Sequence, residues 1–177
     1  SDVCSSDLTV NQQLNKQFYI SGGYQYLLAK DKDVVDQIKN SKLVKRDPVT
    51  FISSYVSMKE YGGLFNRSKH TANLQLAYNN HANNFSASIR AVYRGRFGYS
   101  DLNGNAILDD DREYVKGYTL VNASVTKNFK SGFDIQAGSD NILNHKDINK
   151  LPNLYGRTYF INCNINLTQL FSYNKKQ

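Results

Sequence analysis

Apolar and polar residues alternate with a period of two over long stretches of this chain, which is the pattern of β-strands with two unlike faces. The final run shows it best. One face carries Tyr159, Ile161, Cys163, Ile165 and Leu167, and the other carries Thr158, Asn162, Asn164 and Asn166. A row of asparagines cannot form a dry interior. That face therefore meets water, either outside a soluble sheet or in the lumen of a barrel whose apolar face meets lipid.

The same alternation predicts six strands in all. They cover 16–29, 64–79, 85–99, 114–129, 133–143 and a last strand that ends near 167. Between the first two lies a long polar segment, 30–63. Within it, Val34, Val35 and Ile38 form a small apolar stripe that fits a short helix, but a decorated loop is the preferred interpretation.

The predicted connections alternate between long and short. Outer-membrane β-barrels have long extracellular loops and short periplasmic turns, and their strands are long enough to cross an apolar band of about 25 Å. The predicted strands reach about twice the usual 5 to 6 residues. The fold class expected is therefore all-β, a fragment of an antiparallel transmembrane barrel. A soluble β-sandwich that acts as a binding module, and a passive porin-like channel, remain alternatives.

Composition narrows these alternatives. The mean hydropathy of −0.56 is too polar for membrane helices, but a barrel strand needs only every second residue to be apolar. The net charge of +7 comes from scattered residues. Arg90, Arg94 and Arg96 share one strand face, which indicates a polar wall and not a surface for nucleic acid. Cys4 and Cys163 lie far apart in the sequence and in different surroundings, so they predict neither a disulfide nor a metal site.

The first residues need separate treatment. The segment DVCSSDL, residues 2–8, has no periodicity continuous with that of the later residues, and it matches the translation of a sequencing-library adapter tail, GAC GTG TGC TCT TCC GAT CT. We therefore expect residues 1–8 to be an artefact of a truncated reading frame. Residues 9–177 would then be the C-terminal portion of a barrel.

Several motifs occur in an order typical of one family. DNILNHKD (140–147) is followed by a loop, by YGRTYF (155–160) and by a final alternating strand; EYGGLFNRSKH (60–70) and SGGYQYLLAKDKDV (21–34) lie upstream. This arrangement resembles the C-terminal end of TonB-dependent outer-membrane receptors, of the Bacteroidetes type that takes up metal chelates, haem or cobalamin. The chain departs from the family pattern at Ile142 and Leu143, where Leu-Phe is usual, and at Tyr155, where proline is common.

The resemblance implies a barrel of about 22 strands in the bacterial outer membrane, plugged by an N-terminal domain that contacts the TonB complex. It implies TonB-energised uptake of an iron–siderophore, haem or cobalamin. Enzymatic activity is not expected, because no residues of the sequence support it. The expected partners are the plug, the remaining strands, outer-membrane lipid and the barrel-assembly machinery, with no nucleic acid. The final strand would supply the assembly signal through Tyr159, Ile161, Ile165 and Leu167, although Phe171 or Tyr173 could be its terminal aromatic residue.

One loop resembles a calcium site. In DLNGNAILDDD (101–111), Asp101, Asn103, Asn105 and Asp109 alternate as ligands of an EF-hand loop do. Ala106 stands where glycine is required, and Arg112 stands where a bidentate glutamate is required. A hydrophilic extracellular loop is therefore the favoured interpretation. A Ca²⁺ site in this loop is the alternative.

Basic residues gather at the loop ends of two predicted strands. Arg67 and Lys69 belong to one strand and Arg94 and Arg96 to the next, so a positive cluster is predicted near the extracellular mouth. It would attract an anionic ligand such as a siderophore or a haem propionate; contact with plug carboxylates is the alternative. His145, in the last loop, is the histidine best placed to meet iron or haem. The sequence contains no recognisable catalytic set.

Overall fold

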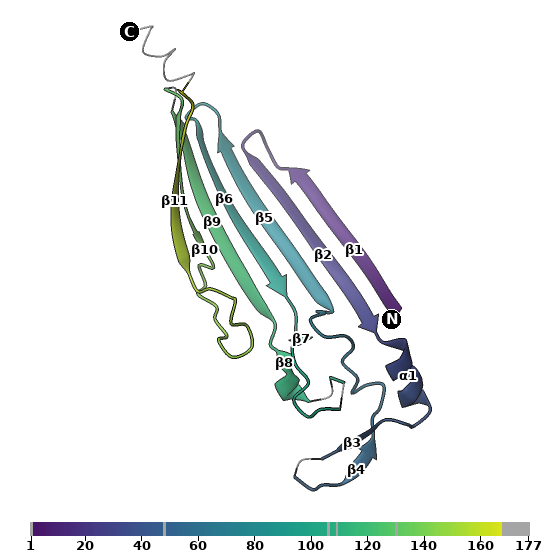
Figure 1. The fold of residues 1–177 in the computed structure, drawn as a ribbon. Helices are drawn as coiled ribbons and strands as arrows, with labels where there is room; N and C mark the ends of the chain where they lie inside the picture. Colours follow the sequence, from purple (N-terminus) through teal and green to yellow (C-terminus); the bar gives the residue numbers. More distant parts are fainter. Residues whose placement is uncertain (1, 48, 106, 109, 130, 168–177) are drawn as a thin grey trace. The chain divides into compact units, whose positions relative to one another are not determined.

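Seven long strands form one sheet in the computed structural model, which describes residues 2–47, 49–105, 107–108, 110–129 and 131–167 (Figure 1). The strands are β1 (Asp2–Gln13), β2 (Phe18–Lys30), β5 (His70–Asn80), β6 (Phe85–Arg94), β9 (Tyr118–Phe129), β10 (Phe133–Asp140) and β11 (Thr158–Ile165). Their order in the sheet is their order in the chain. Such an arrangement is a single meander, so the sandwich interpretation, which needs two packed sheets, is wrong.

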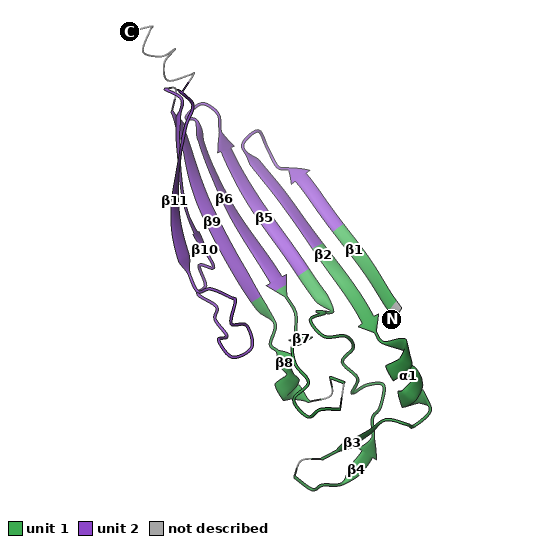
Figure 2. Ribbon diagram, in the orientation of Figure 1, with its two compact units in different colours: residues 1–8, 24–71, 94–118 green, residues 9–23, 72–93, 119–177 purple. Residues whose placement is uncertain are grey.

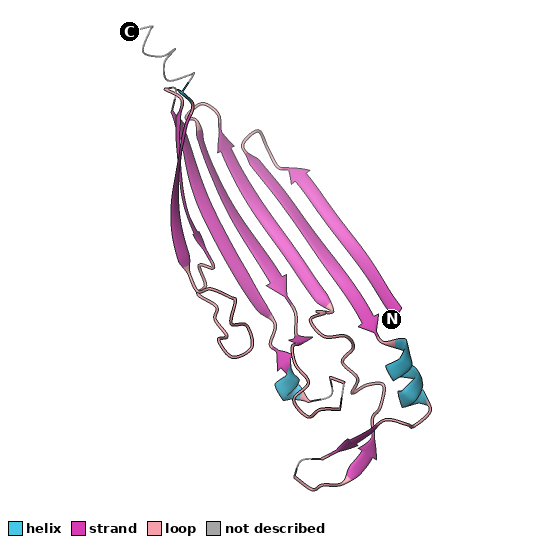
Figure 3. Ribbon diagram, in the orientation of Figure 1, coloured by secondary structure: helices cyan, strands magenta, loops and turns pink. Residues whose placement is uncertain are grey.

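The shorter elements lie in the long connections (Figure 3). They are helix α1 (Lys32–Lys39), the pair β3 (Val44–Arg46) and β4 (Ser53–Tyr55), the pair β7 (Phe97–Gly98) and β8 (Tyr114–Val115), and the 3₁₀ turn η1 (Asp111–Glu113). Among the described residues, no helix is long and apolar enough to cross a membrane.

The alternation of long and short connections is confirmed. Short turns join β1 to β2, β5 to β6 and β9 to β10, and long loops join β2 to β5, β6 to β9 and β10 to β11. The predicted strands were too long at their loop ends. For example, β6 ends at Arg94 because the next amide, that of Gly95, donates to the carbonyl of His70. Similarly, β10 ends where Asn141 adopts a φ of 49°.

Two segments differ from the sequence-based expectation. Residues 2–13, most of which showed no periodicity, form β1 at one edge of the sheet; the adapter origin of residues 1–8 concerns the nucleotide sequence and stays a prediction. Residues 32–39 form helix α1, so the decorated-loop interpretation is wrong. The Asp31 carboxylate caps the helix by accepting from the amides of Asp33 and Val34, at 2.9 and 3.4 Å.

The described chain separates into two compact units (Figure 2). One comprises 1–8, 24–71 and 94–118 and carries the first two long loops; we call it the loop unit. The other comprises 9–23, 72–93 and 119–177 and carries much of the sheet and the last loop; we call it the sheet unit.

In the sheet unit, the register of β10 against β11 confirms the two predicted faces. Asn162 pairs with Gln136, and its side-chain amide donates to the Gln136 oxygen at 3.2 Å. On the opposite face Ile161 pairs with Ala137 and leaves 79% of its surface exposed. An apolar face this exposed is costly in water and suits contact with lipid.

Candidate ligand-binding surface

The two long loops of the loop unit share a hydrophobic core. Ile38 from α1 packs with Val56 and Tyr61 from the same loop and with Ile107 from the second loop. The Tyr61 hydroxyl also accepts from the amide of Asp31, at 3.0 Å, and so fixes the start of α1. These loops are therefore a folded element with an interior of their own, in contrast to the plain hydrophilic loops expected from the sequence.

Glycines allow the loops to approach closely. The Gly62 amide donates to the carbonyl of Leu108, at 2.9 Å, and the Tyr114 hydroxyl donates to the same carbonyl, at 3.1 Å. A Cβ at Gly62 would overlap the Tyr114 hydroxyl, and a Cβ at Gly98 would overlap the Leu108 side chain. Only glycine fits at these two positions while the core stays closed.

Glu113 organises the second loop and was missed in the sequence. Its side chain is completely buried. Its two oxygens accept from the amides of Leu102 and Asp110, both at 3.0 Å. The signal was present as D-x-x-E, from Asp110 to Glu113, which forms a capping box around η1.

The predicted basic cluster is brought together in the loop unit. The segments that carry Arg67 and Lys69 and those that carry Arg94 and Arg96 are joined by backbone hydrogen bonds from Gly95 to His70 and from Asn66 to Gly98, both 2.8 Å. The four basic residues therefore belong to two adjoining segments. Arg67, Lys69 and Arg96 are exposed, and Arg94 is half-buried.

Aromatic rings hold two of these arginines in place. The Arg94 guanidinium lies 3.7 Å from the ring centre of Phe97 and donates to the carbonyl of Asn66. The Arg96 guanidinium lies 3.8 Å from the ring centre of Tyr114 and pairs with Asp111 at 2.7 Å. Stacking fixes the direction of a guanidinium and leaves its charge intact.

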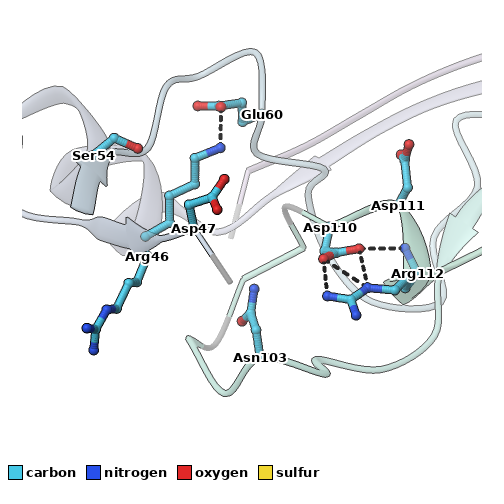
Figure 4. Close-up of a pocket in the computed structure, with 9 residues that line it drawn as sticks. Arg46, Asp47, Ser54, Glu60, Asn103, Asp110, Asp111 and Arg112 are labelled. Atoms are coloured by element: carbon cyan, nitrogen blue, oxygen red, sulfur yellow. Dashed lines mark hydrogen bonds and ion pairs between the residues drawn. The ribbon is translucent and has the colours of Figure 1, made fainter. Parts of the chain in front are cut away.

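An open groove of about 660 Å³ lies between the two loops (Figure 4). Its lining consists of charged and polar side chains: Lys45, Arg46, Asp47, Ser54, Glu60, Asn103, Asp110, Asp111 and Arg112. Two ion pairs lie in it, Lys45 with Glu60 and Arg112 with Asp110. None of these nine residues is apolar.

Local hydrogen bonds lower the pKa of three carboxylates of the groove, those of Asp47, Glu60 and Asp110. Lys45, the Ser57 amide and the Ser57 hydroxyl lower the pKa of Glu60 from 4.5 to about 2. The Arg112 guanidinium and backbone amide lower the pKa of Asp110 from 3.8 to about 2. The amides of Thr50 and Val49 lower the pKa of Asp47. At neutral pH the groove therefore presents fixed charges of both signs.

The oxygens of the predicted calcium loop are used within the loop. Asp101 accepts from the Gly104 amide at 2.7 Å, Asn103 from the Asn105 amide at 3.1 Å, and Asn105 from the Ile107 amide at 3.0 Å. Asp109 lies outside the described residues. Within the part of the chain that is described, no three His, Cys, Asp or Glu side chains are grouped to hold a metal ion. Calcium binding stays a prediction.

His145 lies in the sheet unit, in the last loop. That loop is organised by Asn141, whose side chain accepts from the His145 amide and donates to the carbonyls of His145 and Tyr155. Asn144 accepts from the Arg157 amide, and Arg157 donates to the carbonyl of Ile142. The DNILN and YGR motifs are thus bound to each other, which gives them a structural role.

The residues of the predicted assembly signal are exposed. Tyr159, Ile161 and Ile165 lie in β11, and Leu167 follows it. Phe171 and Tyr173 lie outside the described residues. The assembly role stays a prediction.

Comparison with known proteins identifies the fold. The family model described as "TonB dependent receptor-like, beta-barrel" matches residues 7–142. The chain belongs to this family of TonB-dependent receptor β-barrels. The match begins within the segment predicted to be adapter-derived and includes both long loops of the loop unit.

Two solved structures show a similar fold. The siderophore receptor PiuA from Acinetobacter baumannii aligns with a TM-score of 0.58 and 18% identity over 92% of this chain and 21% of the receptor. A mutant of the ferric enterobactin receptor PfeA from Pseudomonas aeruginosa aligns with a TM-score of 0.58 and 12% identity over 90% and 21%. The chain spans about a fifth of the length of these receptors. No protein of curated function matches it.

Proposed function

We propose that the chain is part of a bacterial outer-membrane receptor that takes up an anionic metal chelate with energy from TonB. Membership of the TonB-dependent receptor family supports this proposal. The exposed apolar face of β11 supports contact with lipid. Receptors of similar fold bear the names of siderophore receptors, so a ferric siderophore is the first ligand to test, before haem and cobalamin.

The observation that carries the proposal is the basic cluster of Arg67, Lys69, Arg94 and Arg96. A ring fixes each of the two arginines on the second segment, so little side-chain freedom would be lost when an anion binds. Guanidinium groups recognise carboxylate and catecholate-type oxygens by charge-assisted hydrogen bonds. Attraction at such exposed sites would weaken as salt screens it.

Charge reversal tests the cluster in the full-length receptor that carries this segment. Arg67→Glu with Lys69→Glu should weaken binding of an anionic ferric siderophore at least tenfold at low salt, because two attractive charges become repulsive. The matched control is Arg90→Glu, on β6 and away from the loop ends. Radiolabelled ferric-siderophore binding and TonB-dependent uptake in whole cells are the measurements.

Two outcomes would contradict the proposal. Equal siderophore affinity in the variant and the control would remove the binding role of the cluster. Uptake that persists when TonB is deleted would favour the passive porin-like channel.

A further inference from the structure

The groove between the two long loops adjoins the basic cluster but is lined by other residues and has a different chemistry. Its lining carries three cations and four carboxylates together with a serine and an asparagine. Pockets for drug-like or haem-like ligands are lined mainly by apolar and aromatic side chains. As far as the described residues define it, the groove has no apolar side chain in its lining against which such ligands could pack.

Two neighbouring residues in this lining, Arg46 and Asp47, lie outside the ion pairs of the groove that the described residues form. The Arg46 guanidinium donates to the carbonyl of Phe51, at 3.2 Å, and lies 5.1 Å from the centre of the Phe51 ring. The Asp47 carboxylate accepts from the amides of Val49 and Thr50, at 2.8 and 2.7 Å. These hydrogen-bond partners are neutral, and among the described residues neither side chain is in an ion pair; the nearby charge of Lys45 also lowers the pKa of Asp47.

The other charged side chains of the groove are in ion pairs. Lys45 is paired with Glu60, Arg112 with Asp110, and Asp111 with Arg96 of the basic cluster. The Lys45–Glu60 and Arg112–Asp110 pairs stay ionised at neutral pH, because the pKa values of Glu60 and Asp110 are lowered to about 2. Among the described residues, Arg46 and Asp47 are therefore the cation and the anion of the groove that are in no ion pair and could pair with a charged ligand.

The two charges are set apart. Arg46 is the last residue of β3, and Asp47 follows it outside the strand. Figure 4 shows the Arg46 side chain pointing away from the Asp47 carboxylate. A free amino acid, with its ammonium and carboxylate adjacent, does not match this separation, whereas an extended chain with opposite charges at its ends does.

We infer that the groove binds a short hydrophilic zwitterionic chain, of the class of small peptides, with a carboxylate at Arg46 and an ammonium at Asp47. The inference rests on the proposed function, because it assumes that these loops lie on the outer side of the membrane. In the receptor, the groove would select ligands that carry such a chain. Asp111 lines the groove and pairs with Arg96, so the basic cluster and the groove are in contact within the loop unit.

The test uses tetra-alanine with free termini as the probe and the full-length receptor in detergent. Ligand-observed NMR titration should show saturable binding that is lost when the peptide is acetylated at its N-terminus and amidated at its C-terminus. Arg46→Gln and Asp47→Asn should each weaken binding about three- to tenfold, the range expected for one exposed charge contact. Asparagine keeps the oxygen that accepts from Val49 and Thr50, so the turn is preserved.

Lys42→Gln is the matched control, because Lys42 is exposed in the same loop and does not line the groove. Equal affinity for free and blocked peptides would overturn the inference, as would unchanged affinity in both groove variants or an absence of binding. Siderophore uptake is measured separately. Normal uptake without peptide binding would remove this inference alone, whereas peptide binding without TonB-dependent uptake would remove the proposed function alone.

Discussion

The loop unit and the last loop of the sheet unit are stabilised in different ways. The two long loops of the loop unit bury apolar side chains around Ile38 and Leu108 and close over glycines. The last loop buries the polar residue Asn141 and is held by hydrogen bonds from side chains to backbone. The two long loops of the loop unit thus reach a fixed conformation by hydrophobic packing, whereas the last loop does so by polar side-chain contacts.

The contrast follows from loop length. Residues 31–69 and 95–117 are long enough to contribute helix α1 and several buried side chains, and their closure entropy must be offset by a core. Residues 141–157 are fewer, and a few asparagine contacts define their path. A long receptor loop can therefore present a preformed groove, which lowers the entropic cost of binding.

Truncation of the loop core should have the largest effect. Leu108 is completely buried and packs on Gly98. Leu108→Ala should destabilise the loop unit by about 3 kcal/mol, within the usual range for a buried leucine. Hydrogen–deuterium exchange of the full-length receptor should show faster exchange in 31–69 and 95–117 and unchanged exchange in 141–157.

The matched control for this core variant is Leu102→Ala, because Leu102 lies in the same loop and is 53% exposed. It should change exchange very little. Equal effects of the two leucine variants would show that the loops have no functional core, and the contrast between the two regions would fail.

Loss of the Asn141 side chain should have the next largest effect. Asn141→Ala removes the contacts to His145 and Tyr155 and puts an alanine at a φ of 49°. We expect a cost of about 2 kcal/mol, from buried groups left unsatisfied and from backbone strain. Exchange should rise in 141–157 alone.

Asn153→Ala is the control in the same loop, since Asn153 is exposed. Asn141→Gly separates the two causes, because glycine relieves the strain and leaves the polar groups unsatisfied. If Asn141→Gly were as stable as the natural protein, the hydrogen bonds of Asn141 would contribute nothing.

Alternation predicted the sheet well, because each residue's face depends only on its position in a strand. The pairing of Asn162 with Gln136 and of Ile161 with Ala137 places both predicted faces correctly. Strand ends were predicted less well. They depend on contacts between distant segments, such as the hydrogen bond from Gly95 to His70, which leave no periodic signal.

The candidate site was less predictable than the sheet. The positions of Arg94 and Arg96 at a strand end indicated a basic cluster, but not the rings of Phe97 and Tyr114 that hold them. The groove was invisible, because it requires 45–60 and 103–112 to pack together. Its sequence signals were local: the cap at Asp31 and the capping box that ends at Glu113.

Acid should have the smallest effect, confined to the ion pairs of the loop unit. The folded-state pKa of Glu60 is lowered from 4.5 to about 2, so its contribution to stability is present above about pH 4.5 and is lost as the pH falls through about 2. Because Lys45 and Glu60 are partly exposed, the loss should stay below about 1 kcal/mol.

Methyl NMR of Ile107 and Leu108 in the full-length receptor can follow the loop core between pH 6 and pH 2. In Glu60→Gln the part of this change due to Glu60 should disappear, while Glu60→Gln with Lys45→Gln should be no less stable at pH 2 than the natural protein. A loop core that loosened between pH 6 and pH 5 would contradict the assignment, because neither Glu60 nor Asp110 titrates there in the folded loops.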